Sequence, residues 1–336
     1  MVQRLQELFI EIGKRKKWPE CYENSVILRS RIECYAEKLM DSYDPAPMWN
    51  FQLYLLNWLD NVETMEEKFL LLNSLSYFVF FNREQCNALY LEALHGPIFK
   101  WLIDINDLNI LDENIDEILS EKIETTFISA ATDSTDISTM HHICGFPMKR
   151  TYIWHSFINP TDDEDEINRK IDSYKNDLHE WKYEQIVVLE DFVGSGTQSI
   201  EVINFLRNFP EWKILFIPLL ICPQGDMAIT KHLHTKEYNH IYYEPISKLP
   251  WELILADERP LGSNCLPNLL ADLKEYARKI YTKVMSTEIS GSKGYLGYRE
   301  TGALFAKYTN CPDNTLPLYN EKENQNWNPL FPRSAR

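Results

Sequence analysis

Residues 186–198 read Ile-Val-Val-Leu-Glu-Asp-Phe-Val-Gly-Ser-Gly-Thr-Gln, and this stretch decides the fold. Its first four residues form a short apolar run of the kind that predicts a buried strand. Residues 199–206 follow with the periodicity of a helix. A strand, a turn of small residues and a helix begin a βα unit, so the stretch indicates an α/β fold.

The turn at the centre of this stretch has the composition of a phosphate-binding loop. Backbone amides at the start of a helix attract a phosphate, aided by the helix dipole. Glycine lets the backbone curl around an anion without a Cβ clash, and serine and threonine add hydroxyl donors. We therefore predict that a phosphate binds at five consecutive residues: Gly194, Ser195, Gly196, Thr197 and Gln198.

Two adjacent acids, Glu190 and Asp191, stand just before this loop. Ligands of open α/β sheets lie beyond the carboxyl ends of the strands. Carboxylates there can accept hydrogen bonds from ribose hydroxyls, or hold Mg²⁺ through the ribose or through water. The pattern predicts a site for a ribose 5-phosphate, with Mg²⁺ as cofactor. Glu190 and Asp191 are the candidate catalytic residues, because carboxylates stabilise the positive charge of an oxocarbenium-like transition state.

The same stretch resembles the PRPP-binding signature of type I phosphoribosyltransferases. That signature has an apolar run, two acids, three variable residues and then a short loop of small residues. Gln198 departs from its last position. Gly194 stands where many members carry an acid that serves as general base, so base assistance from this loop stays open. The resemblance implies a small phosphoribosyl or nucleotide ligand.

Three other nucleotide-binding patterns fit this stretch less well. A Walker A loop is excluded because no lysine follows Gly196. A dinucleotide fingerprint is disfavoured because Ser199 replaces its third glycine. A SAM-dependent methyltransferase stays an alternative, since residues 192–197 look like the Phe-x-Gly-x-Gly-Thr motif of amino-methyltransferases. Those enzymes also use a Pro-Pro-aromatic loop on a flipped base, and the chain has no Pro-Pro pair.

A second polar cluster follows the candidate strand 125–130: Asp133, Ser134, Asp136 and Ser138. If this strand and 185–189 are parallel neighbours, the cluster lies at the same sheet edge as Glu190. The resemblance gives this place to the pyrophosphate loop, and we count the four residues as candidate ligand contacts. A compatible interpretation is a helix cap with Asp133 or Ser134 as N-cap. The basic candidates for a pyrophosphate are Lys149, Arg150 and Lys307.

The rest of the chain divides by pattern. Residues 1–115 have helical periodicity and almost no glycine, and we predict an all-helical N-terminal region. Short β-rich runs then alternate with helices, which predicts a phosphoribosyltransferase-like α/β domain over 116–310, with a mostly parallel sheet flanked by helices. Further strands are expected at 151–154, 214–221, 240–243 and 302–308, and further helices at 226–234 and 269–284. The acidic segment 159–166 is expected to be a mobile loop, and 311–336 a tail packed on the α/β domain.

The carboxyl end carries a second motif, with Asn-Thr-Leu-Pro at 314–317 and Trp-Asn-Pro-Leu-Phe-Pro-Arg at 327–333. Together with the helical front and the 190–198 loop, it resembles the phosphoribosyltransferase-like family of bacterial conflict systems, the PRTase-CE family. The resemblance implies an anti-phage defence effector. In some relatives it is encoded beside a retron reverse transcriptase, which is a candidate partner protein. The first hypothesis from the residues is an enzyme that binds PRPP or a nucleoside phosphate and makes or breaks an N-glycosidic bond. A catalytically inactive module that senses a nucleotide is the other possibility.

Composition limits the partners and the compartment. The formal charge is −16, which repels nucleic acid and anionic membranes, so we expect no membrane contact and no direct nucleic acid contact by the chain alone. The seven cysteines include no Cys-x-x-Cys pair, so neither a disulfide framework nor a zinc ribbon is indicated. We expect no signal peptide, and the apolar run 214–222 is too short to span a bilayer. A cytoplasmic location is therefore expected.

Overall fold

The computed structural model describes residues 2–14, 25–35, 43–45, 50–146, 150–159, 161–234, 238–257, 259, 266–285, 293–321 and 326–333. Contacts divide the chain into two compact units. The sheet unit spans Asn87–Leu249, and the discontinuous unit combines Met1–Cys86 with Pro250–Arg336. In the described residues, no helix is both long enough and apolar enough to cross a lipid bilayer.

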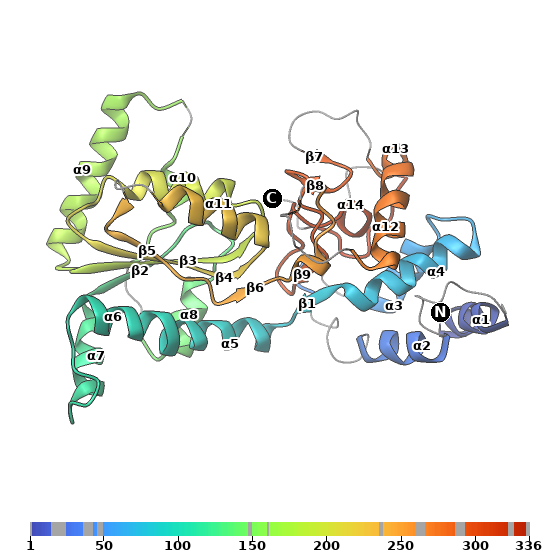
Figure 1. Cartoon of the computed structure of the whole chain (residues 1–336), viewed down its shortest axis with the longest axis horizontal. Coiled ribbons are helices and arrows are strands. Elements are labelled where there is room, and N and C mark those ends of the chain that lie inside the picture. Colours follow the sequence, from blue (N-terminus) through green and yellow to red (C-terminus); the bar gives the residue numbers. More distant parts are fainter. Residues whose placement is uncertain are drawn as a thin grey trace. The chain divides into compact units, whose positions relative to one another are not determined.

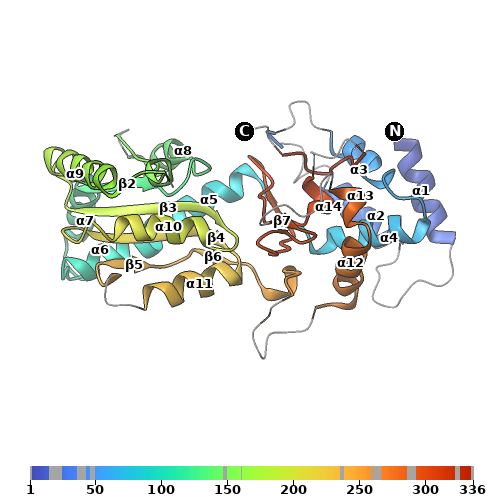
Figure 2. The ribbon, with the colours of Figure 1, turned by 90° about the horizontal axis from the view of Figure 1, so that it is seen from above.

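The sheet unit is built on parallel strands. Its strands are β2 (Thr126–Ala130), β3 (Gln185–Val193), β4 (Lys213–Ile221), β5 (Ile241–Tyr243) and β6 (Ser247–Lys248). Within the described residues they run in the order β2-β3-β4-β5, with β6 also pairing β4, and every one of these pairings is parallel (Figure 2). The predicted fold class, a mostly parallel sheet flanked by helices with helices at the N-terminal end, is confirmed.

Helices cover both faces of this sheet (Figure 1). They are α5 (Arg83–Ala93), η3 (Leu94–Ile98), α6 (Phe99–Ile105), α7 (Ile115–Glu124), α8 (Ile137–Ile143), η4 (Trp154–Phe157), α9 (Glu164–Glu180), α10 (Thr197–Leu206) and α11 (Pro223–Leu233). Successive strand residues point to opposite faces. Ile186 and Val188 therefore enter the core beneath α9, α10 and α11, whereas Val187 and Leu189 enter the core beneath α5 to α8.

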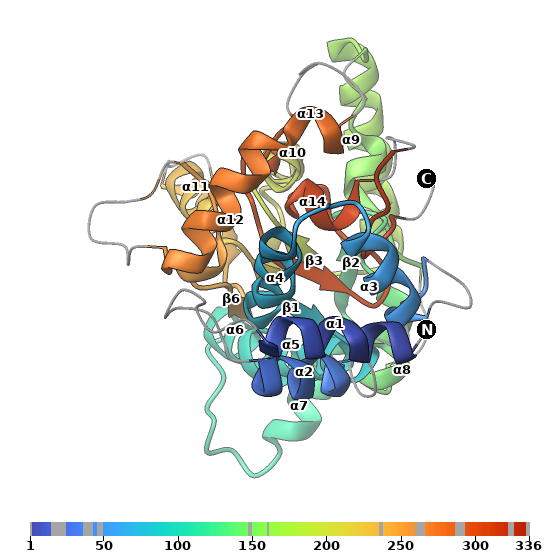
Figure 3. The same ribbon diagram turned by 90° about the vertical axis from the view of Figure 1, so that its right-hand side faces the viewer.

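The discontinuous unit has its own core. Its elements are α1 (Val2–Lys14), α2 (Ser25–Cys34), α3 (Phe51–Leu59), α4 (Met65–Ser74), η2 (Leu75–Tyr77), β1 (Val79–Phe81), η6 (Trp251–Leu253), α12 (Asn268–Lys279), α13 (Tyr281–Val284), β7 (Lys293–Gly294), β8 (Gly297–Tyr298), β9 (Phe305–Lys307) and α14 (Pro317–Asn320). Helix α1 packs on α2 and α12 on α4 (Figure 3). Strand β1 pairs in parallel with β9, which joins the two halves of the unit.

This division differs from the three parts expected at 1–115, 116–310 and 311–336. Helices α5 to α7 pack on the sheet, and the tail packs into the core of the discontinuous unit. The Phe331 ring stacks on Phe78 at 4.8 Å, and Tyr319 stacks on Trp58 at 5.2 Å. Apolar periodicity shows which helix face is buried but not which partner buries it, so these long-range pairings were not predictable from the pattern.

Several local expectations were corrected. Residues 151–154 form no continuous strand: Ile153 makes a single parallel bridge to Ala130, and Trp154 starts a 3-10 helix. Of the expected acidic loop, residues 164–166 are the first turn of α9, capped by Asp163, because carboxylates are favoured at the positive end of a helix. The helix expected over 269–284 is two helices, α12 and α13, and the last strand is only Phe305–Lys307. Residue 160 lies outside the described part of the chain.

Candidate functional site

The candidate site lies where β2 and β3 end side by side. The two strands pair in parallel, with Ala130 opposite Leu189. Parallel strands bring their carboxyl ends to one sheet edge, so the loop after β2 meets the acids of β3. As predicted, the loop after β2 lies next to Glu190. One of its contacts with the acids comes from a predicted residue, Ser134, and one from a residue that the prediction did not name, Thr132.

A chain of hydroxyl groups connects the two acids. Thr132 Oγ1 donates to Glu190 Oε1, Ser134 Oγ donates to Asp191 Oδ1, and the two hydroxyl oxygens lie next to each other. Each of these three oxygen–oxygen distances is 2.8 Å. Glu190 is only 4% exposed, and Asp191 is half-buried. Because hydroxyl donors stabilise a carboxylate charge, this arrangement holds two acids close together at a largely buried strand end.

The backbone around Asp191 is fixed by the same loop. The Asp191 amide donates to Thr135 Oγ1 at 3.1 Å, and the Phe192 amide donates to Asp191 Oδ1 at 2.7 Å. We refer to Thr132, Ser134 and Thr135 as the hydroxyl loop. Only Ser134 was a predicted site residue. Thr132 and Thr135 were missed because isolated threonines carry no sequence signal until the strand pairing is known.

Both acids lie within β3, and not after it as the sequence suggested. Strand β3 continues to Val193 because Phe192 and Val193 are apolar and pair with Leu220 and Ile221 of β4. Glu190 itself stands opposite Pro218. A buried strand therefore positions the acids, which makes them less mobile than loop residues would be.

The predicted phosphate loop is a tight turn between β3 and α10. Gly196 is the N-cap of α10 and has φ +83°, a left-handed conformation that glycine adopts at little cost. A glycine N-cap has no side chain to bind the first-turn amides, which helix geometry leaves without intrahelical partners. The hydroxyls of Ser195 and Thr197 are hydrogen-bonded to each other at 3.2 Å, and Gln198 is exposed. The turn thus has the donors that an anion requires.

Gly225 in the first turn of α11 packs directly against this turn. A Cβ on Gly225 would lie 2.6 Å from the Gly194 carbonyl oxygen and 2.9 Å from Val193 Cγ1. A Cβ on Gly196 would lie 3.2 Å from the backbone of Gly225. All three distances are too short for an undisturbed side-chain contact, so the two glycines fix the position of the loop. Gly225 was not among the predicted site residues, although a glycine just after strand β4 was a usable signal.

The rest of the second cluster mainly caps a helix. Asp136, and neither Asp133 nor Ser134, is the N-cap of α8, and its carboxylate accepts from the Thr139 amide at 2.9 Å and from Ser138 Oγ at 2.7 Å. Partial burial raises the pKa of Asp136, but the hydrogen bonds from Thr139 and Ser138 outweigh it, so the pKa is lowered overall. Asp133 and Ser138 are exposed. Asp136 and Ser138 are therefore engaged in capping.

Of the three basic candidates, the structure describes Arg150 and Lys307. The Arg150 guanidinium lies over the Trp181 ring, 5.2 Å from its centroid. Lys307 belongs to β9 in the discontinuous unit and is buried. Lys149 lies outside the described residues. Among these three, only Arg150 is described within the sheet unit.

Comparison with known proteins gave one match. A family model described as PRTase-CE matches residues 55–333, which is most of the chain. No curated protein matches the chain, and no solved structure does. The match includes β3, the turn before α10, the hydroxyl loop and the carboxyl-terminal motif.

Proposed function

This chain belongs to the PRTase-CE family, which is phosphoribosyltransferase-like, and we propose that its sheet unit binds PRPP or a nucleoside phosphate. One observation carries the proposal: the hydroxyl-linked acids Glu190 and Asp191 stand next to a glycine-capped helix start. Acids suit the hydroxyl groups of a sugar, and helix amides suit its phosphate. A ribose 5-phosphate presents both groups in one molecule.

The proposed roles follow from the chemistry of each group. Glu190 and Asp191 receive hydrogen bonds from the ribose hydroxyls. The amides and hydroxyls of residues 194–198 hold the 5-phosphate. The described residues include no cluster of three or more metal-ligating side chains. Mg²⁺ nevertheless fits, because it keeps several waters and is usually held by one or two carboxylates together with the phosphates of the ligand. The ion would then arrive with the ligand and supply charge neutralisation.

For the reaction, we propose the making or breaking of an N-glycosidic bond at C1 of the ribose. With PRPP, a C1–N bond forms while the bond from C1 to pyrophosphate breaks. The two carboxylates stabilise the positive charge that develops on the ring. In the cell, we propose that the chain serves in a bacterial anti-phage system with a partner protein such as a reverse transcriptase.

A second candidate is a nucleotide sensor without turnover. It is favoured by Gly194, since a glycine stands where a general base would be expected. Such a chain would retain the ligand site but transfer no group. The SAM-dependent methyltransferase is less favoured than either, because the family match supports a phosphoribosyl ligand.

Titration calorimetry with PRPP and Mg²⁺ tests the proposal. We expect the wild-type chain to bind and the Asp191→Asn variant to bind at least tenfold more weakly, about 1.4 kcal/mol. Asp165→Asn, an exposed acid in the first turn of α9, is the matched control and should bind like wild type. Absence of binding by the wild-type chain at millimolar PRPP would contradict the proposal.

Mass spectrometry of the same mixtures separates the candidates. Release of pyrophosphate in the presence of nucleobases identifies the transferase, and PRPP binding without any product identifies the sensor. Stabilisation against heat by SAM, with no effect of PRPP, would instead identify the methyltransferase.

A further inference from the structure

The first turn of helix α11 supports the predicted phosphate loop, and one of its side chains is held from two strands. Gly225 in this turn presents backbone atoms to the turn before α10, where a Cβ would not fit. Asp226 is the next residue. Its carboxylate accepts a hydrogen bond from the Tyr243 hydroxyl at 2.8 Å and pairs with the Lys248 ammonium, also at 2.8 Å. The residue next to the loop's contact point is therefore tied to the sheet.

The two partners of Asp226 come from different strands. Tyr243 is the last residue of β5, and Lys248 is the last residue of β6. Both strands pair in parallel with β4, β5 near its start and β6 at its end. Helix α11 lies next to both strands (Figure 2). A carboxylate bound from two separate segments resists both rotation and sliding of the helix turn that carries it.

The bond to the tyrosine is the stronger of the two contacts. Lys248 is exposed, so solvent screens its ion pair with Asp226. Tyr243 is half-buried. Burial, and then the hydrogen bond to Asp226, raises the pKa of Tyr243, so its hydroxyl stays protonated and donates at neutral pH. A hydrogen bond from a neutral donor to a charged carboxylate is among the stronger kinds in proteins.

Asp226 lies between two other anchors of α11. The Cys222 amide donates to the Val193 carbonyl at 2.8 Å, which sets the place where α11 begins. Ile229, one turn after Gly225, is fully buried in the core beneath the helix. Because Asp226 stands between these anchors and directly beside Gly225, its bonds set the rotation of the first turn. That rotation determines how closely Gly225 approaches the loop.

We propose that Asp226 is a positioning residue for the phosphate loop. Held by Tyr243 and Lys248, it keeps Gly225 against residues 193–196 and so preserves the loop geometry that a 5-phosphate requires. Asp226 acts through the loop and not through contact with the ligand. The proposal rests on the proposed function, because only a loop that binds a phosphate needs this support for affinity. The support of the loop itself is testable in the ligand-free chain.

Calorimetry with PRPP and Mg²⁺ on two variants of equal charge tests this role. Asp226→Ala removes both contacts, and we expect PRPP affinity to fall at least fivefold. Asp226→Asn keeps an oxygen that accepts from Tyr243, so affinity should stay within twofold of wild type. Loss of charge alone would instead strengthen binding of the anionic ligand equally in both variants. Affinities of the two variants within twofold of each other would overturn the proposal.

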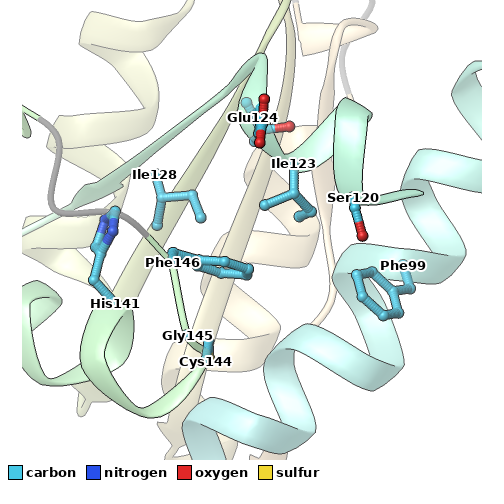
Figure 4. Close-up of a pocket in the computed structure, with 10 residues that line it drawn as sticks. Phe99, Ser120, Ile123, Glu124, Ile128, His141, Cys144, Gly145 and Phe146 are labelled. Carbon is cyan, nitrogen blue, oxygen red and sulfur yellow. The ribbon is translucent and has the colours of Figure 1, made fainter. Parts of the chain in front are cut away.

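Glu184→Ala is the matched control for a general loss of stability. The Glu184 carboxylate also has one lysine and one hydroxyl as partners, Lys122 and Thr125. Glu184 directly precedes β3, at the end of the sheet where Figure 4 shows a cavity of about 250 Å³ lined in part by Thr126. We expect this variant to bind PRPP like wild type. A fall as large as that in Asp226→Ala would overturn the positioning role.

Tyr243→Phe tests whether the tyrosine acts through Asp226. We expect PRPP affinity to fall about threefold, because the ring stays and only the hydroxyl is lost. The double variant Asp226→Ala/Tyr243→Phe should bind no more weakly than Asp226→Ala, since the two side chains act through one bond. Losses that add in the double variant would contradict this path.

Hydrogen exchange of the ligand-free chain separates failure of this role from failure of the proposed function. In Asp226→Ala we expect the peptide that contains residues 193–198 to exchange at least threefold faster, with no change at 126–130. Unchanged exchange at 193–198 would overturn the positioning role even if the wild-type chain binds PRPP. Faster exchange there, in a chain whose wild type binds no PRPP, would support the contact and contradict only the proposed phosphate ligand.

Discussion

Three hydroxyl-bearing residues hold the candidate acids at the end of β3. Thr132 and Ser134 each donate to one carboxylate, and Thr135 accepts from the Asp191 backbone. These neutral hydroxyl donors hold the two acids in position. At the residue scale, the site therefore depends as much on this loop and on two packed glycines as on the acids themselves.

Gly225→Ala tests the packing of the phosphate loop. The new methyl group would meet the Gly194 carbonyl oxygen at 2.6 Å, so the loop must move. We expect PRPP affinity to fall at least tenfold in calorimetry, with only a small change in melting temperature. Gly96→Ala is the control, because its Cβ would meet nothing closer than 3.7 Å. Unchanged affinity in Gly225→Ala would show that the loop does not bind the ligand.

Asp136 makes a prediction about pH. Its pKa is lowered in the folded chain, so its stabilising effect is present at neutral pH and is lost as the pH falls below the ordinary value near 4. Asp136→Ala should destabilise α8 by about 1 kcal/mol at pH 7, because the helix loses its N-cap. Hydrogen exchange in α8 measures this. Asp136→Asn should restore most of the protection, and equal exchange in Asp136→Ala and wild type would contradict the capping role.

At the scale of elements, strand β2 and the buried ring of Trp154 position the site. The segment 150–158 runs beside β2, and Trp154 is fully buried there. The Trp154 indole donates to Ser129 Oγ at 2.7 Å, and Ser129 in turn donates to the Val187 carbonyl at 2.9 Å. These bonds join the 150–158 segment, β2 and β3 just below the acids.

Trp154→Ala should therefore destabilise the sheet unit strongly, by about 3–5 kcal/mol for a large buried aromatic. Trp154→Phe should cost less, since it keeps most of the ring contacts and loses the bond to Ser129. Urea unfolding followed by far-UV circular dichroism measures both. A loss below 1 kcal/mol in the alanine variant would mean that Trp154 does not anchor the segment 150–158.

Sequence patterns predicted the elements of the sheet unit well where they are strongly apolar. β2, β3, β4 and β5 all lie within a few residues of their expected positions, because buried strands of parallel sheets have a clear apolar signature. The prediction of a strand at 151–154 was wrong, because the aromatic residues of this segment pack on other rings instead of completing a β-ladder with β2. For the candidate site, Ser134 was predicted, whereas Thr132 and Thr135 depend on a pairing between distant segments that no local pattern contains. Gly225 carried a signal, as a glycine just after a strand, but its contact with the phosphate loop depends on the fold.

At the scale of the whole molecule, the chain leaves the discontinuous unit, forms the sheet unit and returns. The carboxyl-terminal motif packs against the amino-terminal part of the discontinuous unit. The Asn61 side chain donates to the Asn328 carbonyl and accepts from its amide, and the Trp58 and Trp327 indoles both donate to the Leu318 carbonyl. The motif that carried the family resemblance thus has a structural role in holding the ends of the chain together.

Phe331→Ala tests whether this packing of the carboxyl-terminal motif stabilises the discontinuous unit. Its ring is fully buried and stacks on Phe78 and Phe80, so its removal leaves a cavity that should cost about 3–5 kcal/mol. Thermal unfolding should show an early transition for the discontinuous unit, with the sheet unit transition little changed. A single transition at the melting temperature of the wild-type chain would contradict this structural role of the motif.

The most direct test of the whole account is a crystal structure of the chain with PRPP and Mg²⁺. The account predicts that the 5-phosphate lies within hydrogen-bond distance, about 3 Å, of amides in residues 194–198. It also predicts that the ribose hydroxyls contact Glu190 or Asp191. A phosphate bound elsewhere on the chain, or a sugar that touches neither carboxylate, would contradict it.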